Sequence, residues 1–177
     1  MGIRSFENKS PQCGEGSWVD ASAQVIGDVV LGVDCSVWPC AVIRGDMHQI
    51  RIGDRVSVQD NAVLHITHDS RFNPGGYRLS IGSDVTIAHQ AMLHGCTVGS
   101  RVMIGMQAMV MDGAVIEDDV ILAAGSLVPP GKRLRSGWLY RGRPAEPVRE
   151  LTEEEREFLT YVAGNYVKLK NRYLASE

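Results

Sequence analysis

Aliphatic residues recur every six positions through most of the chain, and this spacing restricts the fold more than any other feature of the sequence. A period of six matches neither the 3.6-residue period of an α-helix nor the simple alternation of an ordinary half-buried strand. It fits a solenoid in which each hexad supplies one short strand and one turn. The repeat comprises four series: Val19, Val25, Leu31, Val37 and Ile43; Ile52, Val58 and Leu64; Ile81, Ile87 and Leu93; and Val98, Ile104, Val110, Ile116, Leu122 and Val128.

Three hexads form one triangular coil of about 18 residues, with the aliphatic side chains pointing inward and stacking from coil to coil. Strands of successive coils then pair in parallel, about 4.8 Å apart. Aromatic residues make up only 6% of the chain, so an aliphatic core is expected. Glycine follows the aliphatic residue in several hexads, which predicts tight turns there. These glycines are Gly32, Gly53, Gly82, Gly99 and Gly105.

The repeat is interrupted in three places. The spacing is nine between Ile43 and Ile52, seventeen between Leu64 and Ile81, and five between Leu93 and Val98. The seventeen-residue interval predicts a loop pushed out of the solenoid over residues 66–80. Loops that interrupt a regular solenoid often carry function.

The last part of the chain has a helical pattern. Thr152 and Glu155 form the signature of a capping box, which predicts a helix start. Apolar residues follow at helical spacing and predict one buried stripe: Phe158, Leu159, Val162, Tyr166, Leu169 and Tyr173. We therefore expect a β-helix domain over residues 1–150 and a helix over 151–177, packed on the β-helix or on a neighbouring subunit.

Charge and composition exclude several classes of protein. The net charge is −3 with no basic run, which argues against nucleic-acid binding. No apolar run is long enough to span a bilayer, and the first residues lack the apolar core of a secretory signal. The four cysteines form no C-x-x-C pair, so Cys13, Cys35, Cys40 and Cys96 are interpreted as reduced thiols in core or turn positions. These features predict a cytoplasmic protein.

Two histidines occupy the same place in consecutive coils. His65 follows Leu64 by one residue, and His94 follows Leu93 by one. Neighbouring strands are about 4.8 Å apart, so the two imidazoles can share one metal ion. Arg44 follows Ile43 by one and joins the same column one coil earlier. His48 and His68 lie in or beside the insertions and are interpreted as non-ligands.

His89 lies on a different face. It follows Ile87 by two residues, and five residues of nearly extended chain, about 16 Å, separate it from His94. Because a Zn–N bond is about 2.0–2.1 Å, His89 of a neighbouring subunit is the better candidate to complete the site. Asp60 stands one coil before His89 in that column, so the same docking brings Arg44 toward the neighbour's Asp60. A cyclic trimer closes such a head-to-tail contact.

These segments resemble the γ-class carbonic anhydrases. The resemblance is carried by Arg44-Gly-Asp46, by Gln59-Asp60-Asn-Ala-Val-Leu-His65 and by His89-Gln-Ala-Met-Leu-His94-Gly-Cys. It extends over nearly the whole chain, including the turn at Gly142-Arg-Pro-Ala and the final helix. Hexapeptide-repeat acyltransferases share the coil but lack this arrangement of three histidines.

The resemblance implies a left-handed parallel β-helix and a homotrimer with zinc-type sites between subunits. It implies that His65 and His94 come from one chain and His89 from the next. Arg44, Asp46 and Asp60 match interface ion-pair positions, and Gln59 matches the residue that hydrogen-bonds the metal-bound solvent. Tyr166, on the helix, resembles a family position near the site. The implied reaction is attack of metal-bound hydroxide on CO2 to give bicarbonate.

The chain departs from the family pattern in its acidic loops. Met47 follows Asp46, and Ile66-Thr67-His68-Asp69 follows His65, so neither stretch contains the glutamates of the most active members. Three alternatives therefore stand: CO2 hydration, whether fast or weak; metal-dependent hydrolysis of an acyl thioester such as an acyl-CoA; and a metal-stabilised trimer without turnover. Three imidazoles suit zinc, and also cobalt and ferrous iron.

Overall fold

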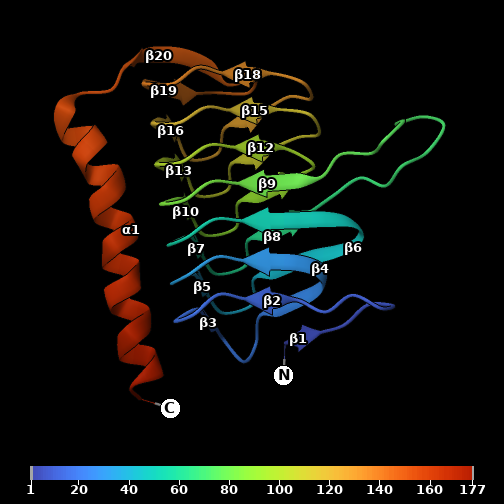
Figure 1. The fold of residues 1–177 in the computed structure, drawn as a ribbon. Coiled ribbons are helices and arrows are strands. Elements are labelled where there is room, and N and C mark those ends of the chain that lie inside the picture. The colour runs from blue at the N-terminus through green and yellow to red at the C-terminus, as the bar shows by residue number, and fades with distance from the viewer. Residues whose placement is uncertain (1, 177) are drawn as a thin grey trace.

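A computed structural model describes residues 2–176 as a parallel β-helix with one long helix along its side (Figure 1). The β-helix is left-handed, as the family resemblance implied. Its strands lie on three faces of a triangular prism. The repeat predicted this architecture, and the strand pairing confirms that equivalent hexads stack from coil to coil: Val37 pairs with Val58 and Val58 with Ile87, and Leu64 pairs with Leu93.

The first face is formed by seven strand segments that pair in parallel from coil to coil. They are β2 (Gln12–Cys13), the second half of β4 (Gln24–Leu31), the second half of β6 (Val42–Ile52), β9 (Leu79–Ile81), β12 (Thr97–Val98), β15 (Val115–Ile116) and β18 (Arg133–Leu134).

The second face has one antiparallel strand, β20, at its end. Its members are β3 (Trp18–Val19), β5 (Ser36–Val37), β7 (Ser57–Val58), β10 (Thr86–Ile87), β13 (Val102–Ile104), β16 (Val120–Leu122), β19 (Trp138–Arg141) and β20 (Glu146–Glu150).

The third face carries His65 and His94. Its members are β1 (Ile3–Arg4), the first halves of β4 and β6, β8 (Val63–His65), β11 (Met92–His94), β14 (Met109–Val110) and β17 (Leu127–Val128).

The aliphatic residues of the repeat form the core between the faces. Leu31, Val37 and Ile43 are at most 2% exposed, and their counterparts in later coils are buried in the same way. The core continues without a break along the prism. Burial of these columns is the main favourable contribution to folding of the solenoid.

The glycines after the aliphatic residues have a different role from the one predicted. Gly32, Gly53 and Gly82 do not adopt positive φ angles. A Cβ on Gly53 would lie 2.7 Å from the backbone carbon of Gly82 in the next coil. Left-handed turn residues come two positions later, at Asp34, Arg55 and their equivalents. Glycine is therefore needed where the backbones of successive coils approach closely, and the bend itself is made elsewhere.

The two longer interruptions of the repeat have different outcomes. The nine-residue spacing becomes a bulge inside β6, where pairing with β4 shifts register between Gly27 and Val29. This bulge carries Asp46 toward the next coil. The chain between β8 and β9 leaves the solenoid as a projecting loop (Figure 1), and Thr67 and Tyr77 pair at its base. The loop is shorter than the predicted 66–80, because Ile66 and Leu79 are buried in the core.

Helix α1 (Glu153–Leu174) begins at the predicted capping box, with both reciprocal hydrogen bonds of Thr152 and Glu155 present. It runs along the second face (Figure 1) and contacts β5 and β10. The predicted buried stripe is partly wrong, because Phe158 is 43% exposed. Tyr173 is 45% exposed, but its ring packs against those of Trp18 and Trp38 at 5.0 and 5.3 Å, as a residue of this stripe should. The fully buried residues of the helix are Leu159, which the stripe included, and Ala163 and Lys170, which it did not.

Lys170 adds a polar contact that the apolar pattern did not predict. It is completely buried, and its ammonium donates hydrogen bonds to Asp34 (2.8 Å) and to the side chain of Asn171 (2.6 Å). A buried charge needs such partners, so the ion pair turns this face of the helix toward the solenoid. No helix within residues 2–176 is long and apolar enough to cross a membrane.

Candidate metal centre

Strands β8 and β11 place two imidazoles side by side. The strands pair in parallel with His65 opposite His94, so the predicted column is present. Nδ1 of His65 lies 3.1 Å from Nε2 of His94, and the ring centroids are 5.1 Å apart. The side chains are 12% and 23% exposed, which keeps them shielded but within reach of solvent.

The donor pair fits a zinc-type ion. Two ligand nitrogens of a tetrahedral site with bonds of 2.0–2.1 Å lie about 3.3 Å apart, close to the spacing seen here. Nδ1 of His94 is hydrogen-bonded to Asp112 at 2.7 Å, so its Nε2 is directed at His65. Burial lowers the pKa of His65, with the hydrogen bond to Asp46 acting in the opposite direction. The neutral imidazole that a metal requires is thereby favoured at neutral pH.

His89 lies apart from this pair. It follows β10 on the second face, and its Nδ1 is 2.9 Å from Asp60. The repeat predicted this neighbour, since Asp60 stands one coil before His89. The His89 side chain is 47% exposed. Among residues 2–176 of one chain, no group of three or more potential metal ligands comes together.

Arg44 and Asp46 flank the two stacked histidines. One guanidinium nitrogen of Arg44 is paired with Asp46 of its own chain, and Oδ1 of Asp46 lies 3.2 Å from Nε2 of His65. The sequence placed Arg44 opposite a neighbour's Asp60, whereas within the chain Asp60 is paired with His89. Arg44 is 41% exposed and keeps further donors for a partner outside the chain.

Gln59 and Tyr166 meet at the corner that carries Asp60 and His89. Gln59 is only 3% exposed, and its side chain lies near the phenol of Tyr166, whose pKa it acts to lower. Burial raises the pKa of Tyr166, and the nearby charge of Asp60 adds to this effect. The ring of Tyr166 also packs at 5.8 Å from that of Trp38. The described chain thus presents two groups of polar residues, one around His65 and His94 and one around His89.

Sequence reasoning did not find Asp112 and Thr67. Asp112 lies just after β14, one coil beyond His94, and its second oxygen accepts a hydrogen bond from Thr67 (2.8 Å). The only signal in the sequence was that Asp112 stands two positions after Val110, in the coil that follows His94. His48 and His68 stay outside the histidine pair, and His48 contacts the carbonyl of Gly75 at 3.3 Å.

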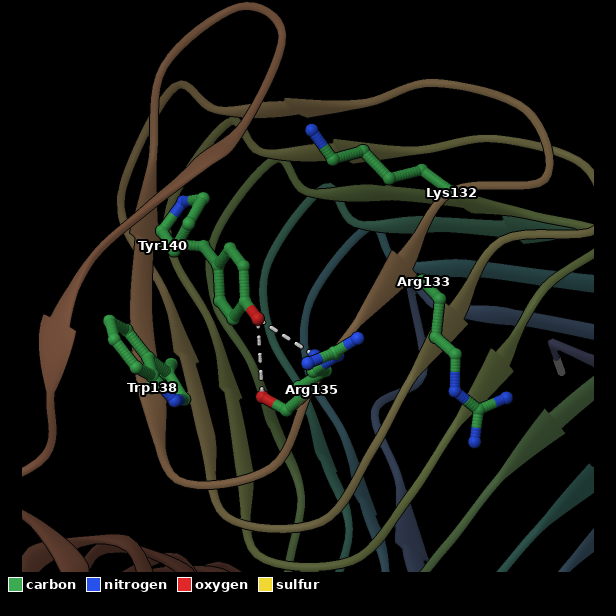
Figure 2. A pocket seen from close by; sticks show the side chains of 6 residues that line it. Lys132, Arg133, Arg135, Trp138 and Tyr140 are labelled. Atoms are coloured by element: carbon green, nitrogen blue, oxygen red, sulfur yellow. Dashed lines mark hydrogen bonds between the residues drawn. The ribbon is translucent and has the colours of Figure 1, made fainter.

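Several cavities lie on the described surface away from the His65–His94 contact itself, and two of them bear on the chemistry. One, of about 510 Å³, is bounded by the projecting loop and by Asp112, with Asn73, Tyr77, Gly113, Pro130 and Gly131 as its other lining residues. The other, of about 300 Å³, lies at the C-terminal end of the solenoid (Figure 2), lined by Lys132, Arg133, Arg135, Trp138, Tyr140 and Pro147.

The cavity in Figure 2 has largely matched charges. Lys132 and Arg133 form ion pairs with Glu146 and Glu117, both at 2.6 Å. The hydroxyl of Tyr140 accepts a hydrogen bond from the backbone N–H of Arg135 at 2.7 Å. Its lining contains no imidazole, thiol or carboxylate. The chemistry typical of a metal centre is therefore located at the histidines.

Comparison with known proteins gives one family match and three relatives that align with at least 92% of this chain. Residues 95–130 match the family model described as bacterial transferase hexapeptide (six repeats). Protein YrdA of Escherichia coli K12 is 51% identical, with 97% of this chain and 94% of that protein aligned. The carbonic anhydrase of Geobacillus kaustophilus is 39% identical over 98% of this chain and 91% of its own. Gamma carbonic anhydrase 2 of Arabidopsis mitochondria is 40% identical over 92% of this chain and 58% of its own.

A solved structure supports the same fold. A Bacillus cereus protein described as a putative acetyltransferase superposes with a TM-score of 0.91 and 35% identity. The superposition covers 99% of this chain and 98% of that one. Relatives of this chain therefore carry both carbonic anhydrase and acetyltransferase names.

Proposed function

Because the chain belongs to the family of γ-class carbonic anhydrases and related hexapeptide-repeat proteins, we propose that it is a metal-dependent enzyme that interconverts CO2 and bicarbonate. The observation that carries the proposal is the convergence of two shielded imidazole nitrogens, 3.1 Å apart, on adjacent coils. Acyl transfer alone gives no reason for two histidines to stack in this way.

In this proposal the active form is a cyclic trimer. His65 and His94 of one subunit and His89 of the next hold a zinc-type ion, for which cobalt or ferrous iron are also suitable. A bound ion supplies a Lewis acid that lowers the pKa of water to about 7. Arg44 and His89 are both exposed, at different corners of the prism. This supports a contact in which the corner that carries Arg44 in one subunit meets the corner that carries His89 in the next.

Gln59 and Tyr166 orient the reactants. The Gln59 side chain is buried beside Tyr166, so its orientation is restricted before substrate arrives. It precedes Asp60, which is paired with His89, so in the proposed trimer it belongs to the neighbouring subunit's share of the site. Arg44, Asp46 and Asp60 carry the charges that align the two corners, with Arg44 adding a bond to the neighbour's Asp60 when the trimer closes.

The test is stopped-flow CO2 hydration on protein loaded with zinc, cobalt or, anaerobically, iron. His94→Ala is expected to lose both tightly held metal and hydration above buffer. His68→Ala is the matched control, because His68 is exposed on the loop, and its metal content should equal that of the unchanged protein. Absence of hydration above buffer with all three metals refutes the proposal.

One observation favours a second candidate, hydrolysis of an acyl thioester. The cavity of about 510 Å³ beside the loop falls in the range of small-molecule pockets and exceeds what CO2 needs. It adjoins Asp112, which touches His94. The two candidates are distinguished by thiol release from a series of acyl-CoAs, measured on the unchanged protein and on His94→Ala. Thioester hydrolysis that depends on His94, without CO2 hydration, identifies the protein as a thioester hydrolase.

A further inference from the structure

Asp112 connects a proposed metal ligand to the base of the projecting loop. Its Oδ1 lies 2.7 Å from Nδ1 of His94, and its Oδ2 accepts a hydrogen bond from Thr67 at 2.8 Å. The carboxylate is one-quarter exposed. Both of its oxygens therefore have partners, and these partners come from a strand and from the loop.

The local backbone leaves room for this carboxylate. Gly95 follows His94 directly and has a φ of +51°. A Cβ at Gly95 would lie 2.3 Å from Oδ1 of Asp112 and 2.6 Å from Cβ of Tyr77. Any other residue would push Asp112 away from His94. The glycine after the histidine is thus required for the contact between imidazole and carboxylate.

The base of the loop packs against the same part of the solenoid, next to Asp112. Thr67 and Tyr77 exchange two backbone hydrogen bonds of 3.0 and 2.9 Å, which close the loop. The Tyr77 ring packs over Gly113, where a Cβ would come within 3.1 Å of Cε1, and Gly113 donates a hydrogen bond to the carbonyl of Gly95. Thr67 is therefore held in place beside Asp112.

We propose that Asp112 is a positioning residue that fixes the ring of His94 for metal binding, with Thr67 of the loop fixing Asp112 in turn. The inference rests on the proposed function, since it assumes that His94 is a ligand. A carboxylate that accepts the Nδ1–H of an imidazole selects the tautomer whose Nε2 lone pair is free, and it makes that nitrogen more basic. Thr67 occupies the other oxygen, so the carboxylate cannot rotate away from the ring.

This arrangement makes the loop part of the support of the metal site. A substrate or partner that contacts residues 66–80 acts on His94 through Thr67 and Asp112, without touching the metal. The cavity that adjoins Asp112 and Tyr77 provides the place for such a contact.

The experiment measures cobalt(II) and zinc affinity by competition with a chromophoric chelator, together with the visible spectrum of the cobalt protein. Asp112→Asn keeps the size of the side chain and removes its charge. We expect affinity to fall 10- to 100-fold, with an altered cobalt spectrum. Thr67→Val keeps the shape and removes only the hydroxyl, so a smaller loss in the same direction is expected.

Asp119→Asn is the matched control. Asp119 is also a turn aspartate, in an ion pair with Arg101, and its left-handed backbone suits asparagine. The metal affinity and the cobalt spectrum of the Asp119→Asn variant should equal those of the unchanged protein. Size exclusion and circular dichroism check assembly and folding of each variant, and Thr67→Val decides the matter if Asp112→Asn does not fold.

Unchanged affinity and spectrum in the folded variants overturn the role of Asp112 and leave the proposed function standing. If the unchanged protein does not bind one metal ion per subunit, both the role of Asp112 and the proposed function are overturned. Loss of affinity in Asp112→Asn and Thr67→Val, with none in Asp119→Asn, supports the inference.

Discussion

Mixing two defective chains should restore metal sites if each site is shared between subunits. His65→Ala removes one ligand from the stacked pair, and His89→Ala removes the ligand on the other corner. Within one chain His89 is paired with Asp60 and does not join His65 and His94. Each variant alone is therefore expected to lack tightly held metal in all its sites.

The expected yield follows from the geometry of a cyclic trimer. A complete site needs a chain with His65 followed around the ring by a chain with His89. In any ring that contains both variants, whether two of one or two of the other, one of the junctions meets this condition. Mixed trimers should thus hold about one ion per trimer, which is about one third of the content of the unchanged protein.

The assay uses co-expression of the two variants with different affinity tags, followed by purification on both tags in sequence. Metal is then measured by elemental analysis after dialysis against a weak chelator. Mixed trimers without metal refute the shared site, as does metal retained at one ion per chain in the His89→Ala protein. Recovered metal should be accompanied by recovered CO2 hydration in the same proportion.

Three further predictions concern stability and reactivity. Leu93→Ala, at a completely buried position of the third face, should lower the free energy of unfolding by about 2–5 kcal/mol in chemical denaturation; a loss below 1 kcal/mol would contradict a packed core there. Burial raises the pKa of Cys35 to about 11 and that of Cys96 to about 12, so both thiols should resist an aromatic disulfide reagent at pH 8 and react only after unfolding. The hydrogen bonds from Arg149 lower the pKa of Glu155 to about 2 from 4.5, so its stabilisation is complete above pH 4.5 and is lost as the pH falls toward 2. The difference in Tm between Glu155→Gln and the unchanged protein should be modest, because the pair is exposed, and should shrink below pH 4; a difference independent of pH contradicts the role of the carboxylate charge.

The hexapeptide spacing was sufficient to predict the coils and the places of the aliphatic residues and of the histidines next to them. Because a strand pairs with its equivalent one coil away, counting from Leu64 and Leu93 was enough to place His65 opposite His94. The same counting placed Asp60 next to His89. The capping box of Thr152 was also predictable, since its hydrogen bonds join residues three apart in the chain.

Other features depended on contacts between residues far apart in sequence. The buried helix face was only partly predicted, because the apolar pattern included the exposed Phe158 and could not include Lys170, which is buried through its ion pair with Asp34. The glycines were assigned to bends, but close approach between coils requires them.

The sequence by itself determined the register of the solenoid, and with it the pairing of His65 and His94, because a fixed period converts position in the chain into position in space. Only the tertiary structure decided the partners of those imidazoles. Asp112 reaches His94 because Gly95 leaves space and Thr67 holds the second oxygen. Such contacts depend on side-chain directions and on the path of the loop, which no repeat in the sequence encodes.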